Sequence, residues 1–197
     1  MAGTRANQLL LDTHRGDHDA AAALFREFSP RMLAYARAFV RGDTRGGAAE
    51  DAVQQAFVQV LTTTPEVLAA VEDTLGWLIR LTRNAALNTL RTHKRSTLRE
   101  KMRAGLARRN GSHGAIGPRD ELVNALSGLA DEHRELLLLR HIAGLSFEQM
   151  AYSLGENRNT VAARYRTALG VLRAAMPEGS PERFGGRMVR HMEVHHE

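Results

Sequence analysis

Residues 144–176 decide the fold of this chain, and they read GLSFEQMAYSLGENRNTVAARYRTALGVLRAAM. Ser146, followed three residues later by Gln149, has the spacing of a capping box and predicts the start of a short helix. Gly155 can adopt the left-handed conformation that ends such a helix. A second helix is predicted over residues 158–175, because apolar side chains recur on one face at Val161, Tyr165, Ala168 and Leu172.

Two helices joined by a glycine turn are typical of a helix-turn-helix, whose second helix enters the major groove of DNA. Opposite its apolar side, the second helix presents Asn159, Ala163 and Arg166, flanked by Ala162 and Thr167. From this stretch alone, a helical hairpin that contacts only its own core is an alternative interpretation.

The overall composition narrows the class of protein. The chain has 197 residues, a hydrophobic fraction of 43% and a net charge of +5, which together indicate one or two folded domains and favour a polyanionic partner. It contains no cysteine, which excludes disulfides and thiolate zinc sites. No apolar run approaches the length of a membrane span, so we expect a cytoplasmic protein without membrane insertion.

Helical periodicity runs along the chain, and we see no strand pattern. We expect the Ser29-Pro30 step to separate two helices, because proline lacks the N–H of a helix interior. In the first of these helices Phe25 is expected to face inward with Leu24 and Phe28. The sequence predicts helices over residues 4–14, 17–28, 30–40, 48–61, 75–95, 120–129 and 131–142, and a loop or short helix over 66–74. Gly16 is expected to end the first of these helices, and Asp17 to cap the second.

The segment 48–61, AAEDAVQQAFVQVL, carries a polar outer face. Val53, Phe57 and Val60 are expected in the core. The opposite face consists of Asp51, Gln54, Gln55 and Val58, which suits a partner protein with a basic and apolar groove. Without neighbouring motifs, a solvated face is the simpler interpretation.

The segment 75–95 has the longest helical pattern, and Trp77 near its start is expected to pack in the core. A polar stripe recurs along it at helical spacing, formed by Arg80, Asn84, Asn88, Arg91 and Arg95. Such a stripe could follow a nucleic-acid strand, with arginine on phosphates and asparagine on base edges. Periodicity alone fits a solvated face equally well.

An Arg- and Gly-rich stretch divides the chain. We therefore predict an all-α protein with two small helical domains joined by a flexible basic linker, whose first part is expected to be helical. The predicted boundaries are an N-terminal domain at 1–96, a linker at 97–118, a four-helix helix-turn-helix domain at 119–176 and a tail at 177–197. His191, His195 and His196 of the tail suggest a metal site, but a mobile tail is poorly preorganised, so we expect no metal and no cofactor.

Three motifs in this order resemble the extracytoplasmic-function (ECF) sigma factors of bacterial RNA polymerase, over roughly residues 17–176. Residues 50–57, EDAVQQAF, are similar to the family's E-D-x-V-Q-E-x-F segment, and residues 76–84, GWLIRLTRN, to its W-L-x-x-I-A-R-N segment. Residues 136–140, 144–151 and 154–155 are similar to the family's second DNA-binding domain. Thr160, Val161 and Arg164 stand where the family has T-V-x-x-R.

The resemblance implies a sigma factor that binds core polymerase and directs transcription initiation. Asp51, Gln54, Gln55 and Val58 would contact the clamp helices of the β′ subunit. The arginine and asparagine stripe would contact the minus-ten element, with Asn84 on a base. The second domain would meet the β flap and the minus-thirty-five element, through Arg158, Asn159, Thr160, Ala162, Ala163, Arg166 and Thr167. An anti-sigma factor is a further implied partner.

This chain departs from the family pattern at three places. Gln55 replaces a usual glutamate, and residues 62–74 lack the aromatic and basic side chains that many members carry there, which leaves the minus-ten preference open. Ala162 and Ala163 stand where basic and serine residues are frequent, so Arg166 is the central basic reader and Arg158 can reach phosphates. Arg164 is expected to pair with Glu148 rather than with DNA.

Two other classes of function compete with the sigma factor. A helix-turn-helix regulator that binds duplex operators without polymerase would leave the block 48–95 unexplained. An enzyme is disfavoured, because the sequence shows no phosphate-binding glycine loop, no nucleophile motif and no histidine–carboxylate pairing.

Overall fold

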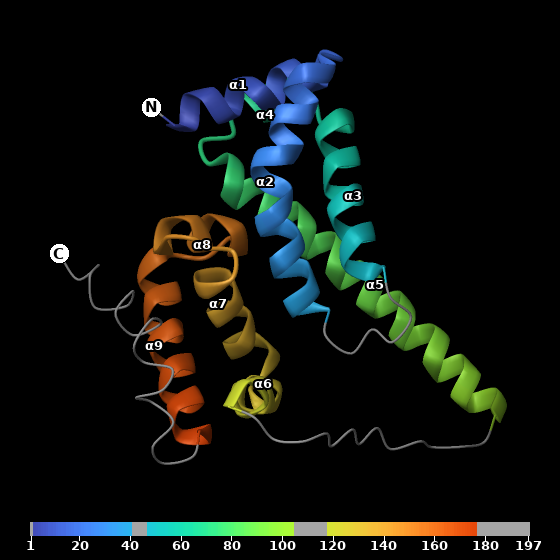
Figure 1. Ribbon diagram of the computed structural model, residues 1–197, viewed down its shortest axis with the longest axis vertical. Helices are drawn as coiled ribbons and strands as arrows, with labels where there is room; N and C mark the ends of the chain where they lie inside the picture. The colour runs from blue at the N-terminus through green and yellow to red at the C-terminus, as the bar shows by residue number, and fades with distance from the viewer. Residues whose placement is uncertain (1, 41–46, 105–117, 177–197) are drawn as a thin grey trace. The chain divides into compact units, whose positions relative to one another are not determined.

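The computed structural model describes residues 2–40, 47–104 and 118–176, and every regular element in these ranges is an α-helix, as the sequence predicts. The chain divides into two compact units. The first comprises Met1–Arg108 with Leu138–Val161, and the second comprises Arg109–Leu137 with Ala162–Glu197. The helices, labelled in Figure 1, are α1 (Ala2–His14), α2 (His18–Phe39), α3 (Ala48–Thr62), α4 (Pro65–Ala69), α5 (Thr74–Ala104), α6 (Pro118–Gly128), α7 (Asp131–His141), α8 (Phe147–Leu154) and α9 (Arg158–Ala175).

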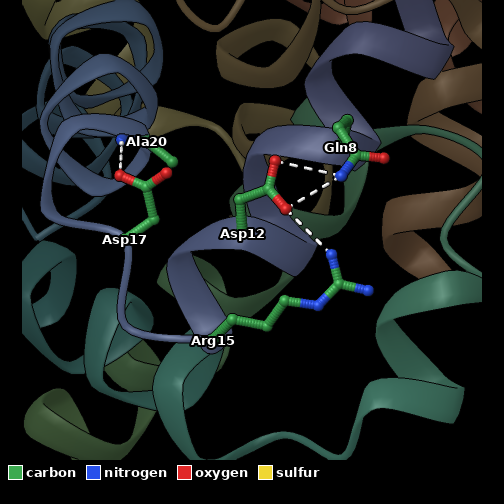
Figure 2. Close-up of polar contacts among 5 residues, drawn as sticks. All are labelled: Gln8, Asp12, Arg15, Asp17 and Ala20. Carbon is green, nitrogen blue, oxygen red and sulfur yellow. Dashed lines mark hydrogen bonds and ion pairs between the residues drawn. The ribbon is translucent and has the colours of Figure 1, made fainter.

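The turn between α1 and α2 forms as the sequence predicts. Gly16 has a positive φ of 91°, and Asp17 caps α2. The Asp17 Oδ1 atom accepts a hydrogen bond from the backbone N–H of Asp19 at 2.9 Å. It also accepts from the backbone N–H of Ala20 at 3.0 Å, as Figure 2 shows. This cap satisfies donors that have no partner within the helix.

The predicted break at Ser29-Pro30 is wrong, because α2 continues through Pro30 to Phe39. A proline inside a helix costs about 3 kcal/mol, since one backbone hydrogen bond is lost. Pro30 lies on the exposed side of α2, where the orphaned carbonyl can bond water. Buried residues before and after it, Leu24 and Met32 among them, hold both halves of the helix against one core.

Helices α2, α3 and α5 pack against one another and form the core of the first unit (Figure 1). Fully buried side chains on these helices include Leu24, Met32, Tyr35, Val60, Leu78 and Ile79. Trp77 is buried, which confirms its expected packing role. The inward placement of Phe25 is wrong: the side chain is 49% exposed, and its ring lies at the edge of the core, 5.0 Å from the Phe57 ring.

Helix α5 is longer than the predicted 75–95, since it starts at Thr74 and continues to Ala104. The first part of the stretch assigned to the linker is therefore helical, and residues 105–117 lie outside the described residues. The predicted tail 177–197, with its three histidines, also lies outside them.

The second unit contains α6, the larger part of α7 and most of α9. Its buried apolar residues are Ala125, Leu129, Leu136, Leu137, Tyr165, Ala168 and Leu172. The Arg164 guanidinium donates to Glu132 Oε2 at 2.9 Å and so joins α9 to α7. These helices correspond to those predicted for the C-terminal part of the chain.

Candidate nucleic-acid and protein interfaces

One side of α5 carries the predicted polar stripe. Arg80, Asn84, Asn88 and Arg91 are all exposed and fall within about 80° of arc at 100° per residue. The opposite side holds the buried residues Leu75, Leu78, Ile79, Thr82 and Ala86. Burial of that side fixes the direction of the stripe, so two arginine and two asparagine side chains project together into solvent. The side chain of Arg95 is outside the described residues.

The stripe is available to an external partner. Among the described residues, Arg80 and Arg91 form no hydrogen bond or ion pair. Buried Thr82 satisfies its hydroxyl within the helix by donating to Leu78 O at 2.8 Å. The helix therefore carries uncommitted positive charge along its outer side, which is the chemistry that binds a phosphate backbone.

The four predicted contact residues of α3, Asp51, Gln54, Gln55 and Val58, are exposed and share one side of the helix. The preceding acidic residue, Glu50, is instead committed within the chain. Arg37 Nη2 of α2 donates to Glu50 Oε1 at 2.6 Å, and this bond is the main cause that lowers the pKa of Glu50. Among the described residues, Asp51 is thus the exposed acidic group of this turn that has no ion-pair partner.

Sequence reasoning missed two apolar side chains beside this surface. Leu61 is 54% exposed and continues the line of Val58 along α3. Phe25 of α2 is exposed next to the Phe57 ring. The helical spacing from Val58 to Leu61 was the signal for the first. Exposure of Phe25 depends on how α2 rotates against α3, which local periodicity does not determine.

The helix-turn-helix forms as the sequence predicts. Gln149 N–H donates to Ser146 Oγ at 3.2 Å, and Ser146 N–H donates to Gln149 Oε1 at 2.9 Å, which completes the capping box. Gly155 ends α8 with a φ of 69°. The turn before α8 is held by Arg140, whose Nη1 donates to Leu145 O at 2.8 Å and whose guanidinium lies 5.1 Å from the Phe147 ring centroid.

The predicted DNA-facing residues of α9 lie away from its buried stripe. Arg158, Asn159, Thr160, Ala163, Arg166 and Thr167 are exposed, and Ala162 is half-buried. Arg166 Nε donates to Ala162 O at 3.4 Å on its own helix, which leaves most of the guanidinium toward solvent. The helix thus presents a largely small and polar side with one central arginine.

The ion pairs of α9 differ from the prediction. Arg164 pairs with Glu132 and not with Glu148, so that prediction is wrong. Glu148 instead accepts from Arg158 Nε, across the turn between α8 and α9. The pKa of Glu148 is lowered first by a hydrogen bond from its own backbone N–H, then by Arg158 and by the Ser146 hydroxyl. A phosphate that binds Arg158 would therefore have to compete with the Glu148 carboxylate.

The residues that the structure describes contain no group of three or more histidine, cysteine, aspartate or glutamate side chains able to hold a metal ion. In the same residues, no helix combines the length and the apolar character needed to span a membrane.

Family comparisons assign the two parts of the chain. Sigma-70 region 2 matches residues 24–96, and Sigma-70 region 4 matches residues 125–174, so together they cover more than half of the chain. The stripe of α5 and the surface of α3 lie in the first match, and the helix-turn-helix lies in the second. The chain belongs to the sigma-70 family.

Relatives place it in the ECF group of that family. It is 26% identical to the ECF RNA polymerase sigma factor SigK of Mycobacterium ulcerans (strain Agy99) over 174 residues, 85% of this chain and 91% of the relative. It is also 26% identical to SigK of Mycobacterium tuberculosis (strain ATCC 25618 / H37Rv), covering 79% of this chain and 86% of that relative. This chain is therefore an ECF sigma factor, whose function is promoter recognition and transcription initiation with RNA polymerase.

Two solved structures share the fold. CnrH, solved in complex with the cytosolic domain of CnrY, matches with a TM-score of 0.60 at 22% identity, covering 86% of this chain and 96% of that chain. RpoE of Bartonella quintana, solved in complex with the anti-sigma factor NepR, matches with a TM-score of 0.55 at 20% identity, covering 74% and 89%.

Proposed function

We propose that the α5 stripe holds the minus-ten element, with Asn84 on a base and the arginines on the backbone. The observation that carries this proposal is the shared exposed side of Arg80, Asn84, Asn88 and Arg91 opposite a buried core. Holding separated strands requires contacts to unstacked bases together with charge along the backbone, and this stripe offers both. Arg95 continues the helical spacing of the stripe and is assigned to the same contact.

We propose that Asp51, Gln54, Gln55 and Val58 bind the β′ clamp helices of the polymerase, with Leu61 adding apolar area. The Arg37–Glu50 pair provides a matched control, because Glu50 is adjacent in sequence but has an internal partner. Asp51→Lys should weaken binding to core polymerase at least about tenfold, since a like charge replaces an attractive one. Glu50→Gln should change that affinity less than about twofold.

The second domain is proposed to read the minus-thirty-five element and to meet the β flap. Arg166 is the central contact, with Asn159, Thr160 and Thr167 beside it and Ala162 and Ala163 at the closest approach. Arg158 is assigned to a phosphate, which requires release from Glu148. An exposed ion pair contributes about 0–1 kcal/mol, so this exchange costs little.

Further parts of the proposal follow from family membership. One solved neighbour is in complex with the cytosolic domain of CnrY and the other with the anti-sigma factor NepR, which supports an anti-sigma factor as a partner of this chain. We place the protein in the cytoplasm, where polymerase acts, and propose a binding role without enzymatic activity. We retain the domain boundaries 1–96, 97–118, 119–176 and 177–197 as a proposal.

The test is run-off transcription from genomic fragments with bacterial core polymerase, with and without this protein. The proposal expects discrete new start sites that need the protein and disappear with Asp51→Lys. The rival is a regulator that binds duplex operators alone. No initiation, together with tight and salt-sensitive binding of duplex DNA by the isolated protein, would support the rival.

A further inference from the structure

The side chain of Asn7 joins α1 to the α4 segment through both of its amide hydrogens. Asn7 Nδ2 donates to Leu68 O at 2.9 Å and to Val71 O at 2.8 Å. An asparagine amide has two donors, and here both are used on backbone carbonyls more than sixty positions away in the sequence. We propose that Asn7 is a positioning residue that fixes the α4 segment, residues 62–74, for reading the minus-ten element.

The α4 segment depends on contacts with other elements of the chain for its stability. Helix α4 has five residues, far below the length at which an isolated helix is stable in water. From Thr64 to Glu72 most side chains are exposed, and the buried ones are Leu68 and Val71. The Leu68 carbonyl at the end of α4 already accepts from Val71 N–H at 3.1 Å, so one Asn7 hydrogen bonds to its second acceptor site and the other bonds to the Val71 carbonyl just beyond α4.

Helix α1 is well placed for this support. It packs against α2 and α4, and Leu10, one turn after Asn7, is fully buried. Helix α1 ends at His14, ten residues before the match to Sigma-70 region 2 begins at residue 24. The bracing residue therefore belongs to this chain's own N-terminal helix and not to the matched segment.

The α4 segment connects the two surfaces of the first unit. It leaves α3, whose outer side we assign to polymerase, and Val71 is followed closely by Thr74, where α5 begins. The position of Val71 thus limits where the first turn of α5 and its Arg80–Asn84 stripe can lie. This inference rests on the proposed function of that stripe and on the family resemblance, in which residues 62–74 bear on the minus-ten preference.

The neighbouring residue provides a matched control. Gln8 Nε2 also makes two side-chain hydrogen bonds, to Asp12 Oδ1 at 2.8 Å and Oδ2 at 2.9 Å, but both stay within α1 (Figure 2). Asn7→Ala and Gln8→Ala each remove one amide and two hydrogen bonds from the same helix. Asn7→Asp keeps the shape of the side chain and removes the donors.

The test uses the full-length protein with core polymerase and two pools of duplex promoter templates, one randomised at the minus-ten element and one at the minus-thirty-five element. Transcripts are sequenced to measure the enrichment of preferred bases. Because both donors to the α4 segment are lost, Asn7→Ala and Asn7→Asp should lower minus-ten enrichment about fivefold to tenfold. Minus-thirty-five enrichment and the Gln8→Ala profile should stay within about twofold of wild type.

Enrichment is a ratio, so it does not change when a variant merely folds less well and transcribes less. A fall in total transcript with unchanged minus-ten enrichment would overturn the assignment of Asn7. Hydrogen exchange gives an independent readout, since Asn7→Ala should speed exchange at the Leu68, Ala70 and Val71 amides and Gln8→Ala should not. Unchanged exchange there would also overturn it. Absence of initiation by the wild type would reject the proposed function itself.

Discussion

The two helices that we assign to promoter DNA differ in how their arginines are used. On α5, Arg80 and Arg91 are exposed and have no hydrogen-bond or ion-pair partner among the described residues. On α9, Arg158 is paired with Glu148 and Arg164 with Glu132, which leaves Arg166 as the exposed arginine at the centre of the DNA-facing side. The arginines of the α5 stripe are thus exposed without an internal partner, whereas two arginines of α9 form ion pairs within the protein.

This difference has a consequence for promoter selection. A phosphate or base can bind the α5 stripe without breaking an internal bond, while on α9 it must compete with carboxylates for two of the arginines. The small side chains of Ala162 and Ala163 further reduce specific contacts. We therefore expect minus-ten contacts to dominate initiation and minus-thirty-five contacts to contribute less.

The largest expected effect is on the α5 stripe. Asn84→Ala should lower initiation from duplex promoters by roughly tenfold to a hundredfold, because a specific base contact contributes about 1–3 kcal/mol. Initiation rates with core polymerase measure this. Thr92→Ala is the control, since that exposed hydroxyl on the same helix donates only to Asn88 O. Equal effects of both substitutions would contradict the assignment.

The next largest effect is expected on minus-thirty-five binding, where two arginines of α9 should contribute differently. Arg166→Ala should weaken minus-thirty-five binding about tenfold, whereas Arg158→Ala should change it less than about threefold, because Arg158 loses an internal partner as well as a phosphate. Fluorescence anisotropy with duplex DNA and the polymerase holoenzyme gives both values. A larger loss with Arg158→Ala than with Arg166→Ala would contradict the assignment of Arg166 as the central contact.

A substitution that adds an arginine to α9 should strengthen minus-thirty-five binding. Ala163→Arg should strengthen minus-thirty-five binding about fivefold, because an exposed position at the centre of the DNA-facing side acquires a donor fork for a phosphate or guanine. The same holoenzyme assay measures it, with Ala174→Arg at the exposed end of α9 as the control. No gain relative to that control would mean that this side of α9 does not approach DNA.

The smallest effect concerns the Glu148 pair. The lowered pKa of Glu148 means that its carboxylate stabilises the folded state above the ordinary value of 4.5, and that this contribution is lost as the pH falls through the folded-state pKa. The free energy of unfolding of the wild type should therefore fall slightly as the pH drops below about 4.5. Glu148→Gln should lack this part of the pH dependence. Thermal unfolding at several pH values measures the difference. Identical pH profiles would contradict the pair's role.

Local rules predicted the parts of the fold that short segments determine. The capping box at Ser146 and Gln149, the left-handed Gly155 and the Asp17 cap each depend on groups within a few residues, and all three are confirmed. The polar sides of α3 and α5 were also predictable, because helical spacing alone places their residues together.

The remaining features depend on contacts between distant segments. Pro30 was expected to end a helix, but packing on both sides of it outweighs the local cost. The partner of Arg164 depends on where Glu132 lies on α7, and the exposure of Phe25 on the rotation of α2. The bonds from Asn7 to the α4 segment join positions more than sixty residues apart, and no local pattern in the sequence indicates them.

The most direct test of the account compares the two DNA-facing helices in one assay. Initiation by core polymerase would be measured with wild-type protein, Asn84→Ala and Arg166→Ala on the same promoter template. We predict protein-dependent initiation by the wild type, a loss of at least about tenfold with Asn84→Ala and a clearly smaller loss with Arg166→Ala. Initiation that survives Asn84→Ala but is abolished by Arg166→Ala would contradict the dominance of the α5 stripe.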